Sequence, residues 1–312
     1  DWVLLADNLG ACCSIDETSL CNEVYTIVSN KAGHGKKGSV IAIVKGTKAN
    51  VVSAILKKIP DSEREKVSEI TMDFSDSMFS IAKQCFPKAT IVIDCFHIVQ
   101  RLCEGLEEMR LRFKRLAVTE SRKEAAAFAQ NEDRKAKQRA YYRKRHPKNK
   151  KERRGRKRIR KQKYKPTLLA NGETKVEMLT RSRNMLAQSG EKWGDSKKER
   201  ARILFGQYPQ MKEAYSLICK VRAIFKSHIT RKEAKEKLHE WYKEVNACTL
   251  REIKAARNAI KGKEEYVLNY FLNRSTNAAA ESLNSKIKGF RAQLHGIADI
   301  PFFLYRVCTI FG

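Results

Sequence analysis

The sequence predicts an α/β fold, in which a mixed five-stranded sheet is flanked by helices and followed by a large all-helical segment. Two observations support this prediction. The first hundred residues alternate between short β-branched runs and amphipathic stretches, whereas apolar residues recur at helical spacing in much of the stretch between residues 98 and 272. The 312 residues are 42% hydrophobic, which is enough for a substantial core and excludes disorder throughout.

The amino-terminal part reads as three strands joined by tight turns and then two helix crossovers. Residues 30–38 contain three glycines and favour a hairpin turn. Helices are predicted at 50–59, where Pro60 ends the pattern, and at 75–86, where Ser75 gives a polar start. The order β-β-β-α-β-α-β indicates a mixed sheet with helices on its faces. The predicted strands are residues 11–18, 23–29, 39–44, 67–72 and 89–93.

The rest of the chain reads as helices. Asn277 is a plausible N-cap for the helix at 278–288, and an apolar last helix is expected at 300–311. Other helices are predicted at 217–225, 234–245 and 250–260. The first helical stripe, which follows residue 98, consists of Leu102, Leu106, Met109, Phe113 and Leu116.

The charge of the chain points to a polyanionic partner. There are 64 Lys and Arg against 35 Asp and Glu, a net charge of +29. The sequence contains no run of 18 apolar residues that could span a membrane. No basic amphipathic membrane helix is evident either, so nucleic acid is the expected partner. Residues 134–165 hold 19 Lys and Arg and the single acid Glu152, a local charge of +18. This basic segment is predicted to be a partly disordered loop that grips DNA phosphates, with contacts from Arg153, Arg154, Arg156, Lys157 and Arg158.

The nine cysteines favour a reducing compartment. Their number is odd and no C-x-x-C pair occurs, which argues against a disulfide framework and a zinc ribbon. The sequence shows no basic-then-apolar leader to read as a secretory signal, and we expect a cytoplasmic, nucleoid-associated protein.

Three acids occupy positions suited to catalysis. Asp16 and Asp73 end predicted strands, where α/β sheets usually build their sites, and Glu281 lies one turn into a helix. Taken alone, each acid has an ordinary structural explanation. Asp16 or Asp73 could be a turn or cap residue, and Glu281 could simply interact favourably with the helix dipole. Together, carboxylates from separate elements can hold two Mg²⁺ ions. Asp94 also ends a strand and competes with Asp73. Of the other nearby acids, Asp76 is a close neighbour of Asp73, and Glu17 faces away from Asp16.

Two strings make the pattern specific. Residues 86–102 (FPKATIVIDCFHIVQRL) and 275–296 (STNAAAESLNSKIKGFRAQLHG) resemble motifs of bacterial insertion-sequence DDE transposases, most closely the ISL3 type. That group has the ribonuclease-H-like core shared with retroviral integrases, and a helical insertion before the helix that carries the catalytic Glu. The resemblance implies a core at residues 1–98 and 272–312. It assigns residues 99–271 to the insertion, which matches only in length and helicity.

The resemblance also implies residue roles. Asp16, Asp73 and Glu281 would be the catalytic, metal-binding triad for Mg²⁺ or Mn²⁺, with two ions expected. Asp94 and His97 would be accessory residues, because in the family an Asp or Cys precedes a His by three positions. The remaining matches, which resemble DNA contacts and could equally be a solvated helix face, are Asn284, Lys288 and Arg291.

The implied reaction is cleavage at the element's ends followed by strand transfer into target DNA. The expected partners are double-stranded DNA and further copies of this chain, with no membrane. A module that reads sequence is expected before residue 1 or on a separate polypeptide. The alternative is a catalytically inactive, decayed remnant that still binds nucleic acid.

Overall fold

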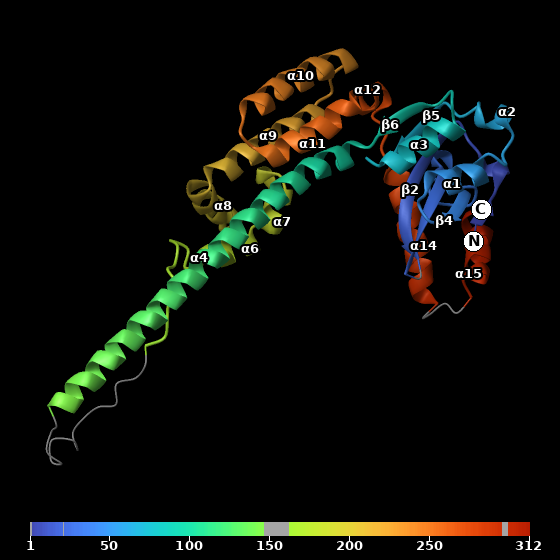
Figure 1. Ribbon diagram of the computed structural model, residues 1–312. Helices are drawn as coiled ribbons and strands as arrows, with labels where there is room; N and C mark the ends of the chain where they lie inside the picture. The colour runs from blue at the N-terminus through green and yellow to red at the C-terminus, as the bar shows by residue number, and fades with distance from the viewer. Residues whose placement is uncertain (1, 21, 147–161, 295–298) are drawn as a thin grey trace. The chain divides into compact units, whose positions relative to one another are not determined.

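A computed structural model describes residues 2–20, 22–146, 162–294 and 299–312 (Figure 1). It contains two compact units, Asp1–Leu102 with Leu217–Gly312 and Cys103–Ser216. This division groups residues 217–271 with the sheet, whereas the sequence assigned them to the insertion. Because this division reflects compactness and not the boundaries of the family's insertion, the predicted core (1–98 and 272–312) and insertion (99–271) stay predictions. Among the described residues, no helix is both long and apolar enough to cross a membrane.

One mixed sheet forms the centre of the first unit, with the strand order β1-β4-β3-β2-β5-β6. Neighbours from β1 to β2 are antiparallel, whereas β5 runs parallel to both β2 and β6. The strands are β1 (Trp2–Leu4), β2 (Cys12–Leu20), β3 (Glu23–Asn30), β4 (Val40–Lys45), β5 (Glu69–Met72) and β6 (Thr90–Ile93).

The predicted count of five strands is wrong, because the described sheet has six. The additional strand is β1, which pairs with β4 at the edge of the sheet. Three residues are too few to show the alternation by which a strand is recognised in a sequence. The mixed α/β class is confirmed.

The longer helices of the sheet-containing unit lie where the sequence predicts them, whereas the short helices at 61–64, 264–268 and 270–273 were not predicted. Ser75 caps α3, its hydroxyl accepting a hydrogen bond from the backbone N–H of Met78, and α15 has the predicted bounds. These helices are α1 (Ala49–Leu56), α2 (Asp61–Arg64), α3 (Asp76–Cys85), α10 (Arg231–Ala247), α11 (Arg251–Gly262), α12 (Glu264–Leu268), α13 (Tyr270–Asn273), α14 (Ala278–Gln293) and α15 (Ile300–Phe311).

Two helices belong to both units, α4 (Cys95–Arg145) and α9 (Pro209–Lys226). The apolar stripe of α4 is helical as predicted and is buried as far as Met109, whereas Leu116 is 54% exposed. The 51-residue helix continues beyond its packed part, and its later turns are dominated by charged residues. The second unit also contains α6 (Lys175–Arg181), α7 (Arg183–Ala187) and α8 (Asp195–Gln207).

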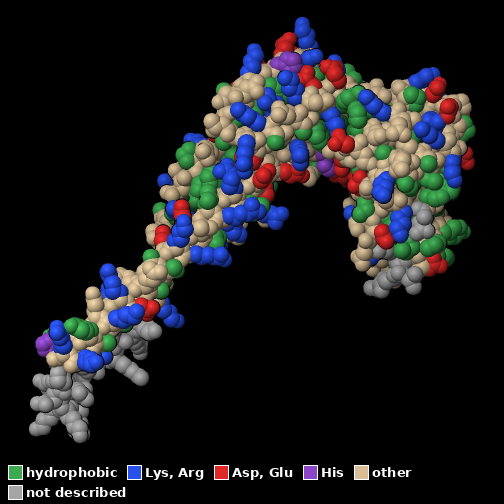
Figure 2. Space-filling view, in the orientation of Figure 1, with side chains coloured by type: hydrophobic (Ala, Val, Ile, Leu, Met, Phe, Trp, Pro, Cys, Tyr) green, Lys and Arg blue, Asp and Glu red, His purple; other side chains and the backbone are tan. Residues whose placement is uncertain are grey.

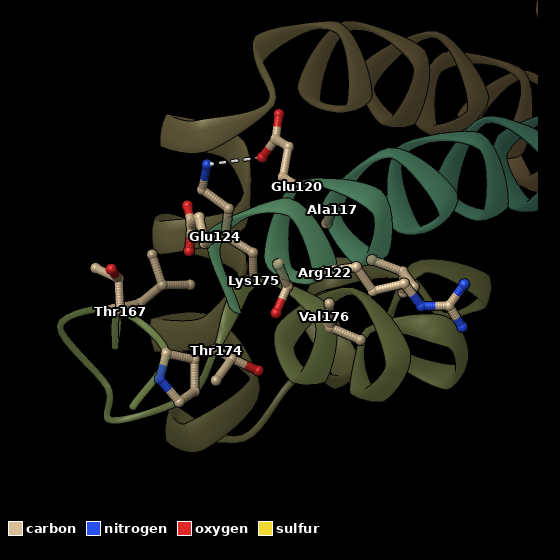
Figure 3. A pocket seen from close by; sticks show the side chains of 12 residues that line it. Ala117, Glu120, Arg122, Glu124, Thr167, Thr174, Lys175 and Val176 are labelled. Atoms are coloured by element: carbon tan, nitrogen blue, oxygen red, sulfur yellow. Dashed lines mark hydrogen bonds and ion pairs between the residues drawn. The ribbon is translucent and has the colours of Figure 1, made fainter. Parts of the chain in front are cut away.

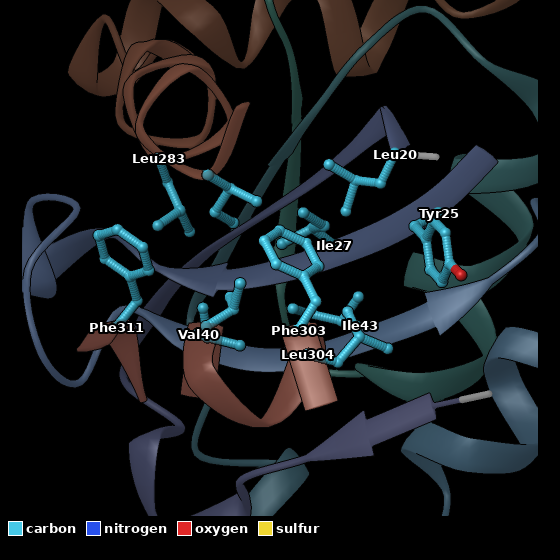
Figure 4. Close-up of a cluster of buried hydrophobic side chains, with 11 residues drawn as sticks. Leu20, Tyr25, Ile27, Val40, Ile43, Leu283, Phe303, Leu304 and Phe311 are labelled. Atoms are coloured by element: carbon cyan, nitrogen blue, oxygen red, sulfur yellow. The ribbon is translucent and has the colours of Figure 1, made fainter. Parts of the chain in front are cut away.

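Helices α14 and α15 cover one face of the sheet (Figure 4). Leu283 of α14 and Phe303 of α15 pack with Leu20 and Ile27 from neighbouring strands. Burying each such side chain contributes about 1.5–3 kcal/mol. Side chains alternate along a strand, so Asp16 lies on the same face of β2 as Leu20, beneath α14. The core therefore brings α14 to the face that holds the first candidate acid.

Candidate active site

The strand register brings three aspartates to one edge of the sheet. Ile15 pairs with Met72 across the parallel strands β2 and β5, and Met72 pairs with Ile93. An aspartate directly follows each of these paired residues. Asp16 lies within β2, Asp73 comes directly after β5 and Asp94 directly after β6. The carboxyl ends of parallel strands meet at the same edge. The structure thus places Asp16 and Asp73 beside each other.

Asp16 is 8% exposed, and both of its carboxylate oxygens accept hydrogen bonds. One bond comes from the backbone N–H of Glu17 (2.7 Å) and the other from Nδ2 of Asn284 (2.6 Å). Burial, followed by repulsion from Asp73 and a further contribution from Glu281, raises the pKa of Asp16 to about 6. The site therefore concentrates negative charge around a buried carboxyl.

Asp73 contacts two side chains. Its Oδ1 lies 2.8 Å from Nε2 of His97 and accepts a hydrogen bond from Nδ2 of Asn277 at 3.1 Å. Burial alone would lower the pKa of His97, but the hydrogen bond and charge of Asp73, with the charges of Asp94 and Asp16, raise it. The imidazole is thus held on the second candidate acid.

Asp94 is 3% exposed and bonds to backbone groups. Its Oδ1 accepts from the N–H of Phe96 at 2.8 Å, and its Oδ2 accepts from the N–H of Asn277 at 2.6 Å. The first bond satisfies a free donor at the start of α4, and the second fixes the residue before α14. Asp94 therefore joins two helix starts, and its carboxylate is not the one that contacts His97.

Asn277 has a role that the sequence did not predict. Its side chain makes no capping hydrogen bond, although it precedes α14 as expected. It is fully buried and donates from Nδ2 to Asp73 and to the carbonyl of Ile15, while its Oδ1 accepts from Thr71. The only signal in the sequence is the polar stretch before the helix, which does not reveal these distant partners.

The remaining predicted residues of α14 divide by exposure. Glu281 and Lys288 are exposed, Arg291 is half-buried and Asn284 is buried. The side chain of Glu281 forms no hydrogen bond or ion pair with a described residue, and its negative charge acts on Asp16 through space. Nothing in this geometry tests the predicted DNA contacts of Asn284, Lys288 and Arg291.

The carboxylates do not form a closed cluster. Within the described ranges, no group of three or more His, Cys, Asp and Glu residues is arranged to hold a metal ion. Asp76 forms an ion pair with Lys263, which lowers the pKa of its carboxyl. Burial and the charge of Asp73 raise the pKa of Glu17. The charges of Asp73 and Glu281 both act on Asp16. Metal binding by these three carboxylates stays a prediction.

Comparison with known families identifies the chain. The family model of the ISL3-type DDE transposases, described as transposase, matches residues 13–307. The chain belongs to the ISL3-type DDE transposase family. Searches of curated proteins and of solved structures found no match.

The basic segment of this transposase chain lies partly beyond the described residues. Its residues 134–145 form the end of α4, so the loop predicted there is wrong for these residues. Arg153, Arg154, Arg156, Lys157 and Arg158 all lie outside the described residues. Lys and Arg side chains are also spread over the described distal part of α4 (Figure 2). Of these, Lys135 and Arg139 both pair with Glu132.

A separate pocket lies in the second unit of the transposase chain (Figure 3). It has a volume of about 410 Å³ and lies between α4 and the segment that leads into α6. Glu120 and Lys175 form an ion pair there. None of the predicted site residues in the described part of the chain lines this pocket, so it is not the site of the chemistry inferred from the acids.

Proposed function

We propose that this chain is the catalytic region of a DNA transposase that cleaves insertion-sequence ends and transfers the strands to target DNA. The observation that carries the proposal is the placement of Asp16 beside Asp73 at the carboxyl edge of the sheet, under the helix that bears Glu281. Strand order supports a ribonuclease-H-like core, since β4-β3-β2 is antiparallel and β2-β5-β6 is parallel. If the other five strands form the ribonuclease-H-like sheet, β1 is an additional strand at its edge.

The residues present fit a divalent cation. Carboxylates are the hard oxygen ligands that Mg²⁺ and Mn²⁺ prefer. The buried Oδ1 of Asn284 lacks a hydrogen-bond partner, and burial, together with the charges of neighbouring acids, raises the pKa of Asp16. Both features indicate a site that lacks a positive partner. Asp16, Asp73 and Glu281 would hold the metal, which supplies activation of the attacking oxygen and charge stabilisation at the phosphate.

The protein's own groups would orient the site and the DNA. His97 holds Asp73, while the exposed Lys288 and the half-buried Arg291 lie on the helix that carries Glu281. These cations, with the basic segment 134–165, would bind the phosphate backbone of double-stranded DNA without reading its sequence. We further propose that copies of the chain assemble on DNA and that a separate module reads the element's ends.

A strand-cleavage assay tests this function. DNA carrying the element's own ends is incubated with the protein and Mg²⁺ or Mn²⁺. The variants Asp16→Asn, Asp73→Asn and Glu281→Gln should lose cleavage while DNA binding persists. Asp76→Asn is the matched control, because Asp76 is paired with Lys263 and should not be needed. Wild-type protein that binds the ends but never cleaves them would favour the decayed remnant.

A further inference from the structure

Two buried amides flank Glu281 in the sequence, one at the residue just before α14 and one within this helix. Asn277 precedes Glu281 by four residues and Asn284 follows it by three, so all three lie on one helical face. Asn277 is fully buried and Asn284 is 5% exposed. Both amides therefore face the sheet, where polar groups are retained only if they find partners.

Each amide donates to a different candidate carboxylate. Nδ2 of Asn277 lies 3.1 Å from Oδ1 of Asp73, and Nδ2 of Asn284 lies 2.6 Å from Oδ2 of Asp16. Hydrogen bonds to ionised oxygens are about twice as strong as neutral ones. One helix thus binds the two strand carboxylates through separate donors, with Glu281 between them.

Asn277 is itself held in place by the sheet. Its Nδ2 also reaches the carbonyl of Ile15, its Oδ1 accepts from Thr71, and its backbone N–H donates to Asp94. These partners belong to β2, β5 and the end of β6. The start of α14 is therefore fixed relative to all three strands that end at the site.

Asn284 is poorly explained as a packing residue. Its Oδ1 is buried without a hydrogen-bond partner, a cost of about 1–3 kcal/mol. Its neighbours Leu283 and Ile287 already anchor α14 in the apolar core. An apolar residue at position 284 would avoid this cost. The amide's one hydrogen bond is to Asp16, which indicates that orienting this carboxylate is its purpose.

We propose that Asn277 and Asn284 are positioning residues that orient Asp73 and Asp16 for metal binding and set the place of Glu281 between them. This inference rests on the proposed metal-dependent function. It adds two residues that act through the carboxylates. It also gives Asn284 a role that differs from the DNA contact implied by the family resemblance.

The test is Mn²⁺ affinity, measured by calorimetry on the full chain. Asn284→Leu keeps the branched shape of the side chain and removes the donor to Asp16. The dissociation constant for Mn²⁺ should rise about 10–100-fold, as it does when groups that orient metal ligands are removed. Cleavage by this variant should recover at saturating Mn²⁺. Ser285→Ala, at the exposed neighbouring position, should keep wild-type affinity.

Asn277→Ala tests the second amide, with Asn273→Ala as its matched control. Asn273 also donates to a carboxylate, that of Glu69, but touches no candidate catalytic residue. Affinity should fall only in Asn277→Ala, measured on protein whose folding is verified by thermal unfolding. If Asn277→Ala does not fold, Asn284→Leu decides the proposal.

The outcomes separate this inference from the proposed function. Wild-type protein that binds no Mn²⁺ would overturn the metal-dependent function. Wild-type protein that binds Mn²⁺, with Asn284→Leu binding it equally well, would overturn the positioning role alone. A weakened affinity that saturating Mn²⁺ restores to wild-type cleavage supports it.

Discussion

His97 contacts Asp73 through Nε2 at 2.8 Å, although Asp94 is the aspartate that precedes it by three residues. The two carboxylates therefore differ in their surroundings. Asp73 accepts from the side chains of His97 and Asn277, whereas Asp94 accepts from the backbone of Phe96 and Asn277. This difference supports a chemical role for Asp73 and a structural one for Asp94.

Asparagine substitutions should separate these two roles. Asp73→Asn should abolish metal-dependent nicking with little loss of stability. Asp94→Asn should lower the free energy of unfolding by about 1–3 kcal/mol, because an amide NH₂ would then face a backbone N–H that now bonds to an oxygen. Thermal unfolding and a nicking assay on folded protein measure both effects. Nicking that survives Asp73→Asn and is lost in Asp94→Asn would make Asp94 the second ligand.

The histidine should matter through its hydrogen bond to Asp73. His97→Ala removes this bond and should reduce cleavage about 10–100-fold, the usual effect of removing a group that orients a metal ligand. His97→Gln can still present an N–H near the position of Nε2 and should retain most of the activity. Cleavage rates at fixed Mn²⁺ test this pair. Equal losses in the two variants would contradict a role based on the donor alone.

The sequence was most informative where strand ends determine position. Asp16 and Asp73 were predicted to end strands. This is correct for Asp73, which follows β5, but wrong for Asp16, which lies inside β2. The parallel pairing of β2 with β5 stops at Ile15 and Met72, and this register places the two aspartates side by side. The partner of His97 and the role of Asn277 were not predictable in this way. Asn277 bonds to Ile15 and Asp73, which are more than 200 residues away in the chain. Such contacts arise only after α14 packs on the sheet.

Asp16→Asn should stabilise the metal-free protein. The pKa of Asp16 in the folded state is about 6, above its ordinary value of 3.8, so its stabilising contribution is complete below pH 3.8 and lost as the pH rises through 6. Asparagine does not ionise, and a flipped Asn284 could offer its unpartnered Oδ1 to the new amide. At pH 7.5 the gain should be on the order of 2–3 kcal/mol. Thermal unfolding in a chelator across pH 4–8 measures it.

Asp76→Asn is the control for this pH dependence. The pKa of Asp76 is lowered by its hydrogen bond to Lys263 and by the charge of that lysine. Its contribution is therefore present above its ordinary pKa and lost as the pH falls, the reverse of Asp16. The substitution should give no stabilisation at pH 7.5. A similar gain in both variants would show that general charge reduction is responsible for the effect.

Neutralising the basic segment should flatten the salt dependence of DNA binding. Residues 148–161 contain ten Lys and Arg, and replacing these with Gln removes the densest charge of the segment 134–165. Each lost phosphate contact should reduce the slope of log K against log salt concentration by about 0.9 on double-stranded DNA. Arg202→Gln with Lys220→Gln is the control, because both side chains lie outside the segment and already pair with Glu199 and Glu244, respectively. Titrations between 50 and 200 mM salt, roughly the range where such contacts dominate, provide the measurement. An unchanged slope in the segment variant would show that the segment does not bind the DNA backbone.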